Sequence, residues 1–73
     1  MQDYKEFISP ENQASLRIRL FKVIAVKKIG ITQAARAMSC SFNTIRSFLF
    51  DHKDITQFET LMKIDDYVVN NEG

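Results

Sequence analysis

Apolar residues recur every three or four positions along most of this 73-residue chain, and no segment alternates strictly between apolar and polar residues. A spacing of three or four is typical of amphipathic helices, whereas strict alternation is typical of strands. Glycine occurs only at positions 30 and 73, and proline only at position 10. We therefore expect one compact all-α domain over residues 1–73, built from four or five helices.

The first long helix is expected between Ser9 and Gly30. Ser9 can accept hydrogen bonds from the free N–H groups at a helix start, and Pro10 suits the first helical position because it has no N–H to satisfy. Gly30 is expected to end the helix. A typical surface helix has a narrower apolar stripe. We therefore expect this helix to be central, or to be covered on a second side by a partner chain. Its apolar residues are Leu16, Ile18, Leu20, Phe21, Val23, Ile24 and Ala25.

Three further helices are expected after position 30. Thr32 can cap a short helix over residues 33–38, and Ser41 can cap another over residues 42–50. A polar loop follows at 51–54, and a C-terminal packing helix at about 56–69. Residues 1–8 are expected to form a flexible arm or a short docking segment, and residues 70–73 a frayed end. The apolar side of the last helix comprises Phe58, Leu61, Met62, Ile64, Val68 and Val69.

The two short helices have the spacing of a helix-turn-helix. Ala35 is small enough for a close crossing of the two helices, and Ile45 follows ten positions later on the inner face of the second helix. This spacing is typical of the motif: a small residue, then a turn four residues later, then an inward β-branched residue six residues after the turn. The other residues expected to point inward are Met38, Cys40, Phe48 and Leu49.

The stretch TQAARAMSCSFNTIRSFL, residues 32–49, resembles the DNA-binding helix-turn-helix of bacterial and phage regulators. Its TQAAR…NTIR frame is similar to the Fis-type version. The longer frame, residues 16–68, is similar to the Cro/repressor-like (lambda-repressor-like) family, in which GITQ opens the second helix. FETLMKI, residues 58–64, resembles the helix after the recognition helix. The resemblance implies a Cro/repressor-like fold, with the helix-turn-helix at about residues 31–50.

Two positions depart from that family. Ser39 stands where the family usually has a left-handed glycine, at a cost of about 1 kcal/mol. Phe42 stands early in the recognition helix, where polar or basic residues are commoner. If it is exposed it can contact a thymine methyl group or a protein partner; the alternative is that it folds inward.

The resemblance implies that the helix over residues 42–50 enters the major groove of double-stranded DNA. Arg46 can pair with guanine or clamp a phosphate, and Asn43 can recognise adenine through two hydrogen bonds. The expected base contacts are Ser41, Phe42, Asn43, Arg46 and Ser47. The expected phosphate contacts are Lys27, Lys28, Thr32, Gln33, Arg36 and Lys53.

Charge is distributed unevenly along the chain, although the formal net charge is only +1. Residues 12–50 hold seven basic and no acidic side chains, whereas residues 1–11 carry −2 and residues 51–73 carry −4. A basic block of this length favours a polyanionic partner, nucleic acid above all. The acidic last third would be repelled by phosphate if it faced DNA.

Other classes of function have little support in the sequence. One cysteine and one histidine leave almost no zinc ligands, and Asp65 and Asp66 point in different directions on a helix. We expect no enzyme activity, metal, cofactor or small-molecule ligand, and Cys40 as core filler. No apolar run approaches the ~18 residues of a membrane span, and the N-terminus does not resemble a signal peptide. We expect a cytoplasmic, nucleoid-associated protein of a bacterium or phage-infected host.

The interpretation is a small transcriptional regulator, such as a repressor, that recognises a specific DNA sequence. Because one recognition helix reads few base pairs, we expect a homodimer. One alternative is a protein-binding module on the same scaffold, for example an antirepressor or an inhibitor, which Phe42 and the acidic last third favour. The other is non-specific binding of nucleic acid.

Overall fold

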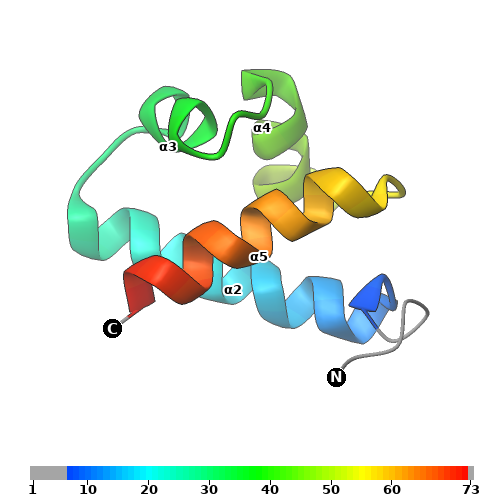
Figure 1. Cartoon of the computed structure of the whole chain (residues 1–73). Helices are drawn as coiled ribbons and strands as arrows, with labels where there is room; N and C mark the ends of the chain where they lie inside the picture. Colours follow the sequence, from blue (N-terminus) through cyan, green and yellow to red (C-terminus); the bar gives the residue numbers. More distant parts are fainter. Residues whose placement is uncertain (1–6, 73) are drawn as a thin grey trace.

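The computed structural model describes residues 7–72. Within this range there are four helices and no strand: α2 (Pro10–Lys27), α3 (Ile31–Ala37), α4 (Phe42–Phe50) and α5 (Phe58–Glu72), labelled as in Figure 1. Helices α2 and α5 pack side by side, and α3 and α4 lie together across one side of this pair (Figure 1). The prediction of a compact all-α fold is confirmed for these residues.

Helix α2 begins as predicted but ends earlier. The Ser9 hydroxyl accepts a hydrogen bond from the Asn12 N–H at 3.2 Å, and Pro10 is the first helical residue. At the other end Lys28, with φ 55°, takes the left-handed conformation expected of Gly30. The Lys28 N–H donates to the Ala25 carbonyl (3.2 Å) and the next N–H, of Ile29, to the Ile24 carbonyl (3.3 Å). This two-bond closure ends the helix without glycine.

Helix α3 begins one residue before the predicted cap. Gly30 occupies the capping position with an extended backbone, and its carbonyl accepts from the Ala34 N–H at 3.0 Å. Thr32 therefore lies inside the first turn, and the prediction that it caps the helix is wrong. The chain reverses at Ser39, whose φ is 56°. Cys40 N–H then donates to the Ala35 carbonyl at 2.9 Å, which closes α3 in the same way as α2.

Helix α4 has the predicted bounds and the predicted cap, because the Ser41 hydroxyl accepts from the Thr44 N–H at 3.2 Å. Helix α5 starts two residues later than predicted and continues to Glu72 instead of residue 69. The expectation of a frayed end is wrong for residues 70–72. Asn71 donates from its side chain to the Tyr67 carbonyl at 2.7 Å, and Glu72 pairs with Arg19 of α2. Gly73 lies outside the described residues.

The hydrophobic core lies where the inner faces of the four helices meet. Two predicted core faces are narrower than expected, because Ile18, Phe21 and Ala25 of α2 and Met62 and Val69 of α5 are exposed. The buried apolar residues are Phe7, Leu16, Leu20, Val23, Ala34, Ala35, Met38, Ile45, Phe48, Leu49, Ile55, Leu61, Ile64 and Val68.

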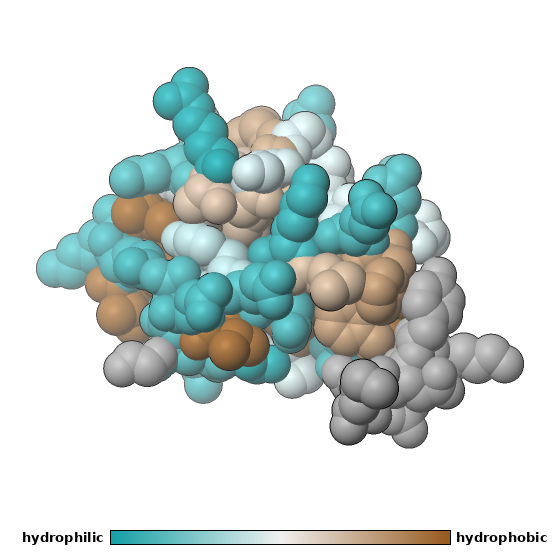
Figure 2. Space-filling model, viewed as in Figure 1, coloured by the Kyte–Doolittle hydropathy of each residue, from teal (hydrophilic) through white to brown (hydrophobic). Residues whose placement is uncertain are grey.

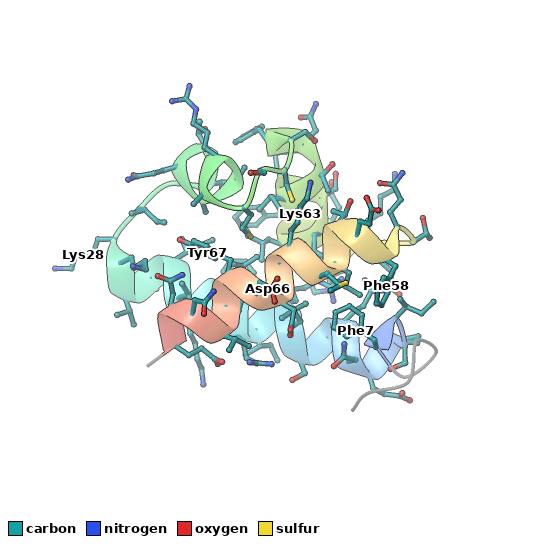
Figure 3. The ribbon with its side chains drawn as sticks, in the orientation of Figure 1. Phe7, Lys28, Phe58, Lys63, Asp66 and Tyr67 are labelled. Carbon is teal, nitrogen blue, oxygen red and sulfur yellow. The ribbon has the colours of Figure 1, made fainter. Side chains whose placement is uncertain are left out.

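The segment before α2 is packed on the domain where it is described. Phe7 is buried, and its ring meets the ring of Phe58 edge to face, with centroids 5.2 Å apart. Figure 3 shows these two side chains together at the start of α5. A flexible arm is therefore wrong for residues 7 and 8, which match the docking alternative. Residues 1–6 lie outside the described range.

Two buried polar side chains of α2 form hydrogen bonds with other parts of the domain. The Gln13 amide donates to the carbonyls of Ile8 and Ile55, each at 3.0 Å, and its oxygen accepts from the Ile55 N–H at 2.6 Å. Arg17 donates through Nε to the Phe48 carbonyl and through its terminal nitrogen to Asp54 at 3.3 Å. Within residues 7–72, every buried side-chain nitrogen and oxygen has a hydrogen-bond partner.

Candidate nucleic-acid interface

Helices α3 and α4 pack against each other through small side chains and lie at a steep angle in Figure 1. Ala34 and Ala35 are almost fully buried at this contact, and Met38 closes it beside the turn. The four residues 38–41 connect the two helices. The predicted pair of short helices is therefore present, and the connection begins one residue before the predicted turn at 39–41, because α3 ends at Ala37.

Helix α4 has one buried face and one exposed face. Ile45, Phe48 and Leu49 point into the core, with at most 1% of each side chain exposed. Asn43 and Arg46 lie on the other side of the helix and are exposed, and Phe42, which is in line with Leu49 but lies at the first turn, is exposed as well. Phe42 is 45% exposed, so the alternative in which it folds inward is wrong. These three side chains are exposed in the N-terminal half of α4 and are open to a ligand.

The two serines among the predicted base contacts are less available. The Ser41 hydroxyl caps α4 and also shares a hydrogen bond with the Thr44 hydroxyl at 2.7 Å. Ser47 is half-buried. Phe42, Asn43 and Arg46 are thus the base-contact candidates that the structure leaves most accessible.

The predicted phosphate contacts are all exposed, but they fall into two groups. Thr32, Gln33 and Arg36 lie on the outer side of α3, and the end of α2 supplies Lys27 and Lys28 just before that helix begins. Lys53 lies on the other side of α4, in the loop that leads to α5. The two groups therefore flank α4 from opposite sides.

An open groove of about 400 Å³ runs along α4 on the Lys53 side. Its lining includes hydroxyl, amide and ammonium groups, which can donate hydrogen bonds to an anion, beside the Asp54 carboxylate and the apolar Ile55. Sequence reasoning missed several of its residues because they meet only after α5 packs beside the loop. The groove is lined by Asn43, Thr44, Ser47, Lys53, Asp54, Ile55, Thr56, Gln57 and Thr60.

Lys63 is a cation near the α3–α4 turn that sequence reasoning missed. It extends from α5 toward the α3–α4 turn (Figure 3), and its Nζ lies 3.5 Å from the Ser39 carbonyl oxygen. Burial raises the pKa of the nearby Cys40 thiol, and the positive charge of Lys63 opposes that rise. The half-buried Cys40 packs against the core, as predicted for core filler. No sequence spacing could have placed Lys63 here, since its position depends on the packing of α5.

The basic block contributes fewer free cations than its sequence indicates. Arg17 is buried and paired with Asp54, and Arg19 forms a two-bond ion pair with Glu72, with Nε to Oε2 at 2.9 Å. The hydrogen bond from Arg19 lowers the pKa of Glu72. Burial raises the pKa of Asp65, whereas the charge of Arg19 opposes that shift. Two of the seven basic side chains of residues 12–50 are therefore paired with acidic residues of the same domain.

Figure 2 shows hydrophilic side chains over most of the face that carries α5, with hydrophobic residues in separate spots. None of the helices within residues 7–72 is both long enough and apolar enough to cross a membrane. In the same range, no three histidine, cysteine, aspartate or glutamate side chains are grouped so that they could hold a metal ion.

Comparisons with models of protein families, with curated proteins and with solved structures found no match. The resemblance to Cro/repressor-like regulators therefore stays a prediction from the sequence.

Proposed function

We propose that this protein binds double-stranded DNA in a sequence-specific manner and acts as a small transcriptional regulator, with α4 in the major groove. The observation that carries the proposal is the exposed face of α4. Asn43 and Arg46 point outward there and Phe42 is exposed at the first turn, while Ile45, Phe48 and Leu49 of the same helix are fixed in the core. A helix held in this way can present side chains to base edges in a groove that admits an α-helix.

Each of the three side chains has a distinct role. Arg46 donates two hydrogen bonds to O6 and N7 of guanine, and Asn43 pairs with N6 and N7 of adenine. Phe42 contacts a thymine methyl group. Arg46 makes no hydrogen bond or ion pair with any of residues 7–72, so its guanidinium loses no internal partner on binding.

The flanking polar groups provide phosphate contacts on both sides of α4. Arg36, Thr32 and Gln33 serve one strand, together with Lys27. Lys53 and the hydroxyls of the groove serve the other. Such contacts fix the orientation of the protein but do not specify sequence. A regulator of this kind would act in the cytoplasm, associated with the nucleoid.

The test is selection of binding sites from a random double-stranded DNA pool, with the double variant Asn43→Ala/Arg46→Ala beside the wild type. We expect a short enriched motif that the double variant does not enrich. Arg46→Ala alone should cost about 1–3 kcal/mol of binding and relax the preference at one position. Lys22→Ala is the matched control, because Lys22 is an exposed cation on α2 outside the proposed interface. A folded wild-type protein that enriches no motif would contradict the proposal.

The same experiment separates the two alternative functions. Exposed Phe42 favours a protein-binding module, which would bind no DNA at any salt concentration. A non-specific nucleic-acid binder would bind every sequence, and Arg46→Ala would weaken all of them equally.

A further inference from the structure

Helix α2 carries a second stripe of side chains, directed away from the core. Its helical members are Glu11, Ala14, Ile18, Phe21 and Ala25, and Lys28 follows as the residue that ends the helix; all six are exposed. The five helical members are spaced three, four, three and four residues apart, which is the spacing of the contact seam between two packed helices. The residues that fasten α2 to the domain, such as Gln13, Arg17 and Leu20, are buried on its other side.

The centre of the stripe is apolar and unusually exposed. Ile18 is 59% exposed and Phe21 is 38% exposed. The Phe21 ring also meets the ring of Phe50 edge to face, with centroids 5.5 Å apart, and Phe50 is 53% exposed. Phe50 therefore widens the apolar surface beyond α2. The two phenylalanines alone expose on the order of 200 Å².

We propose that this stripe is the interface of a homodimer, in which α2 of one subunit packs antiparallel to α2 of the other about a two-fold axis. The axis passes between Ile18 and Phe21, so that Ile18 meets Phe21 of the partner subunit. Ala14 then meets Ala25 of the partner subunit, and these small residues allow the helices to approach closely. The pairing is self-complementary, as an interface of this symmetry requires.

The charges at the two ends of the stripe favour a second copy of this chain as the partner, and they favour the antiparallel orientation. In the antiparallel register Glu11 faces Lys28 of the partner subunit, and symmetry repeats this pair at the other end of the seam. A parallel register would place Glu11 against Glu11 and Lys28 against Lys28, which is repulsive. The stripe has an acidic residue at one end and a basic residue at the other. It is therefore complementary to an identical stripe that runs in the opposite direction. This pairing assigns Lys28 to the dimer, and Lys27 remains a phosphate contact.

The interface borders the proposed DNA-binding face at one end of α4. Phe50, at the last turn, belongs to the stripe; Arg46 lies one helical turn before it, about 6 Å along the axis, and Phe42 and Asn43 lie about 12 Å away at the first turn. The helical part of the seam extends over about 21 Å, from Glu11 to Ala25. An interface of one helix plus Phe50 falls at the small end of protein interfaces. We therefore expect a reversible dimer with a dissociation constant of roughly 10–100 µM.

Sedimentation equilibrium of the protein without DNA tests the dimer independently of DNA binding. Glu11→Lys and Lys28→Glu should each weaken association about tenfold, because both symmetric ion pairs become repulsive. The double variant Glu11→Lys/Lys28→Glu should restore it to within about threefold of the wild type, since the pairs are reformed with exchanged signs.

Ile18→Ser should abolish association while circular dichroism shows an intact fold, because Ile18 contributes no core contact. Val26→Ser is the matched control: Val26 is 79% exposed on the same helix but outside the stripe, and association should not change. A wild-type protein that stays monomeric at concentrations around 10–100 µM would overturn the proposal. So would a double variant Glu11→Lys/Lys28→Glu that associates no better than the two single variants. If the protein forms the dimer but enriches no DNA motif in the binding-site selection, the proposed DNA binding is contradicted and the dimer is not.

Discussion

Arg17 lies over the ring of Phe48, with the guanidinium carbon 4.6 Å from the ring centroid, and the same guanidinium donates a hydrogen bond to the Phe48 carbonyl. Arg17 belongs to α2, and Phe48 to the last turn of α4. The carbonyls of a last helical turn have no partner within their helix, and a cation is favourable there. A residue counted with the basic block is thus an internal cap that fixes the end of the proposed recognition helix.

Arg17→Met is therefore expected to destabilise the protein by about 2 kcal/mol, because it leaves the Phe48 carbonyl without its donor and removes the contact with the ring. Urea unfolding of the purified variant measures this loss. Arg19→Met is the matched control. It breaks an exposed ion pair with Glu72 and should cost less than about 1 kcal/mol. Equal losses in the two variants would show that the cap at Phe48 contributes little.

Ser39→Gly is expected to stabilise the protein by about 1 kcal/mol, since glycine adopts the left-handed conformation of position 39 without steric cost. For a domain of this size, the midpoint of thermal unfolding should rise by roughly 4–8 °C. Ala37→Gly, two residues earlier and inside α3, should have the opposite effect because glycine weakens a helix. A fall in the melting temperature of Ser39→Gly would contradict the turn geometry.

Asp65→Asn should stabilise the protein at neutral pH, with a pH dependence of defined sign. Burial raises the pKa of Asp65 in the folded state, so folding favours the protonated form. Ionisation of Asp65 therefore lowers the stability of the folded protein. This loss of stability is absent below the usual aspartate pKa of about 4 and develops as the pH rises through the raised pKa. Unfolding free energies of variant and wild type should thus converge at low pH and separate toward pH 7.

Glu72→Gln provides the comparison of opposite sign. The hydrogen bond from Arg19 lowers the pKa of Glu72, so its contribution to stability is present above the pKa of the unfolded chain. That contribution is lost as the pH falls through the lowered value. The variant should be less stable than the wild type at pH 7, and the difference should disappear in acid. The same pH trend in both variants would contradict these assignments.

Cys40 should react slowly with iodoacetamide in the folded protein, at least about tenfold slower than in the urea-unfolded chain, because the thiolate is the reactive form. Burial raises its pKa and limits access. Lys63→Ala should slow the reaction further, since the positive charge of Lys63 lowers the pKa of the thiol. A faster reaction in the folded protein would indicate an activated thiol.

Local signals in the sequence predicted several elements well. Ser9, Pro10 and Ser41 act within four residues along the chain, and each cap forms as expected. The inward residues of α4 also follow from helical periodicity alone. By contrast, Gly30 and Thr32 were misassigned because the two-bond closure at Lys28 ends α2 early, and Gly30 then caps α3. A left-handed lysine has no distinctive sequence signal.

The candidate interface was predictable only where it lies on a single helix. The outward positions of Asn43 and Arg46 follow from the period of α4. Lys63 joins the turn only through the packing of α5, and Arg17 and Arg19 leave the basic surface through contacts with Asp54 and Glu72. Charge counted along the chain cannot separate a cation that faces solvent from one that holds two helices together.

The hydrogen bonds between Gln13 and Ile55 connect positions 42 residues apart in the sequence. Residues 52–57 contain no helix or strand, and such a segment usually exchanges its amide hydrogens rapidly with solvent. The Ile55 amide, however, is buried and bonded to a side chain of α2. It can exchange only when the loop separates from α2 and the hydrogen bonds between Gln13 and Ile55 break. Ile55 should therefore exchange about as slowly as the helical core, in contrast to the other amides of the loop.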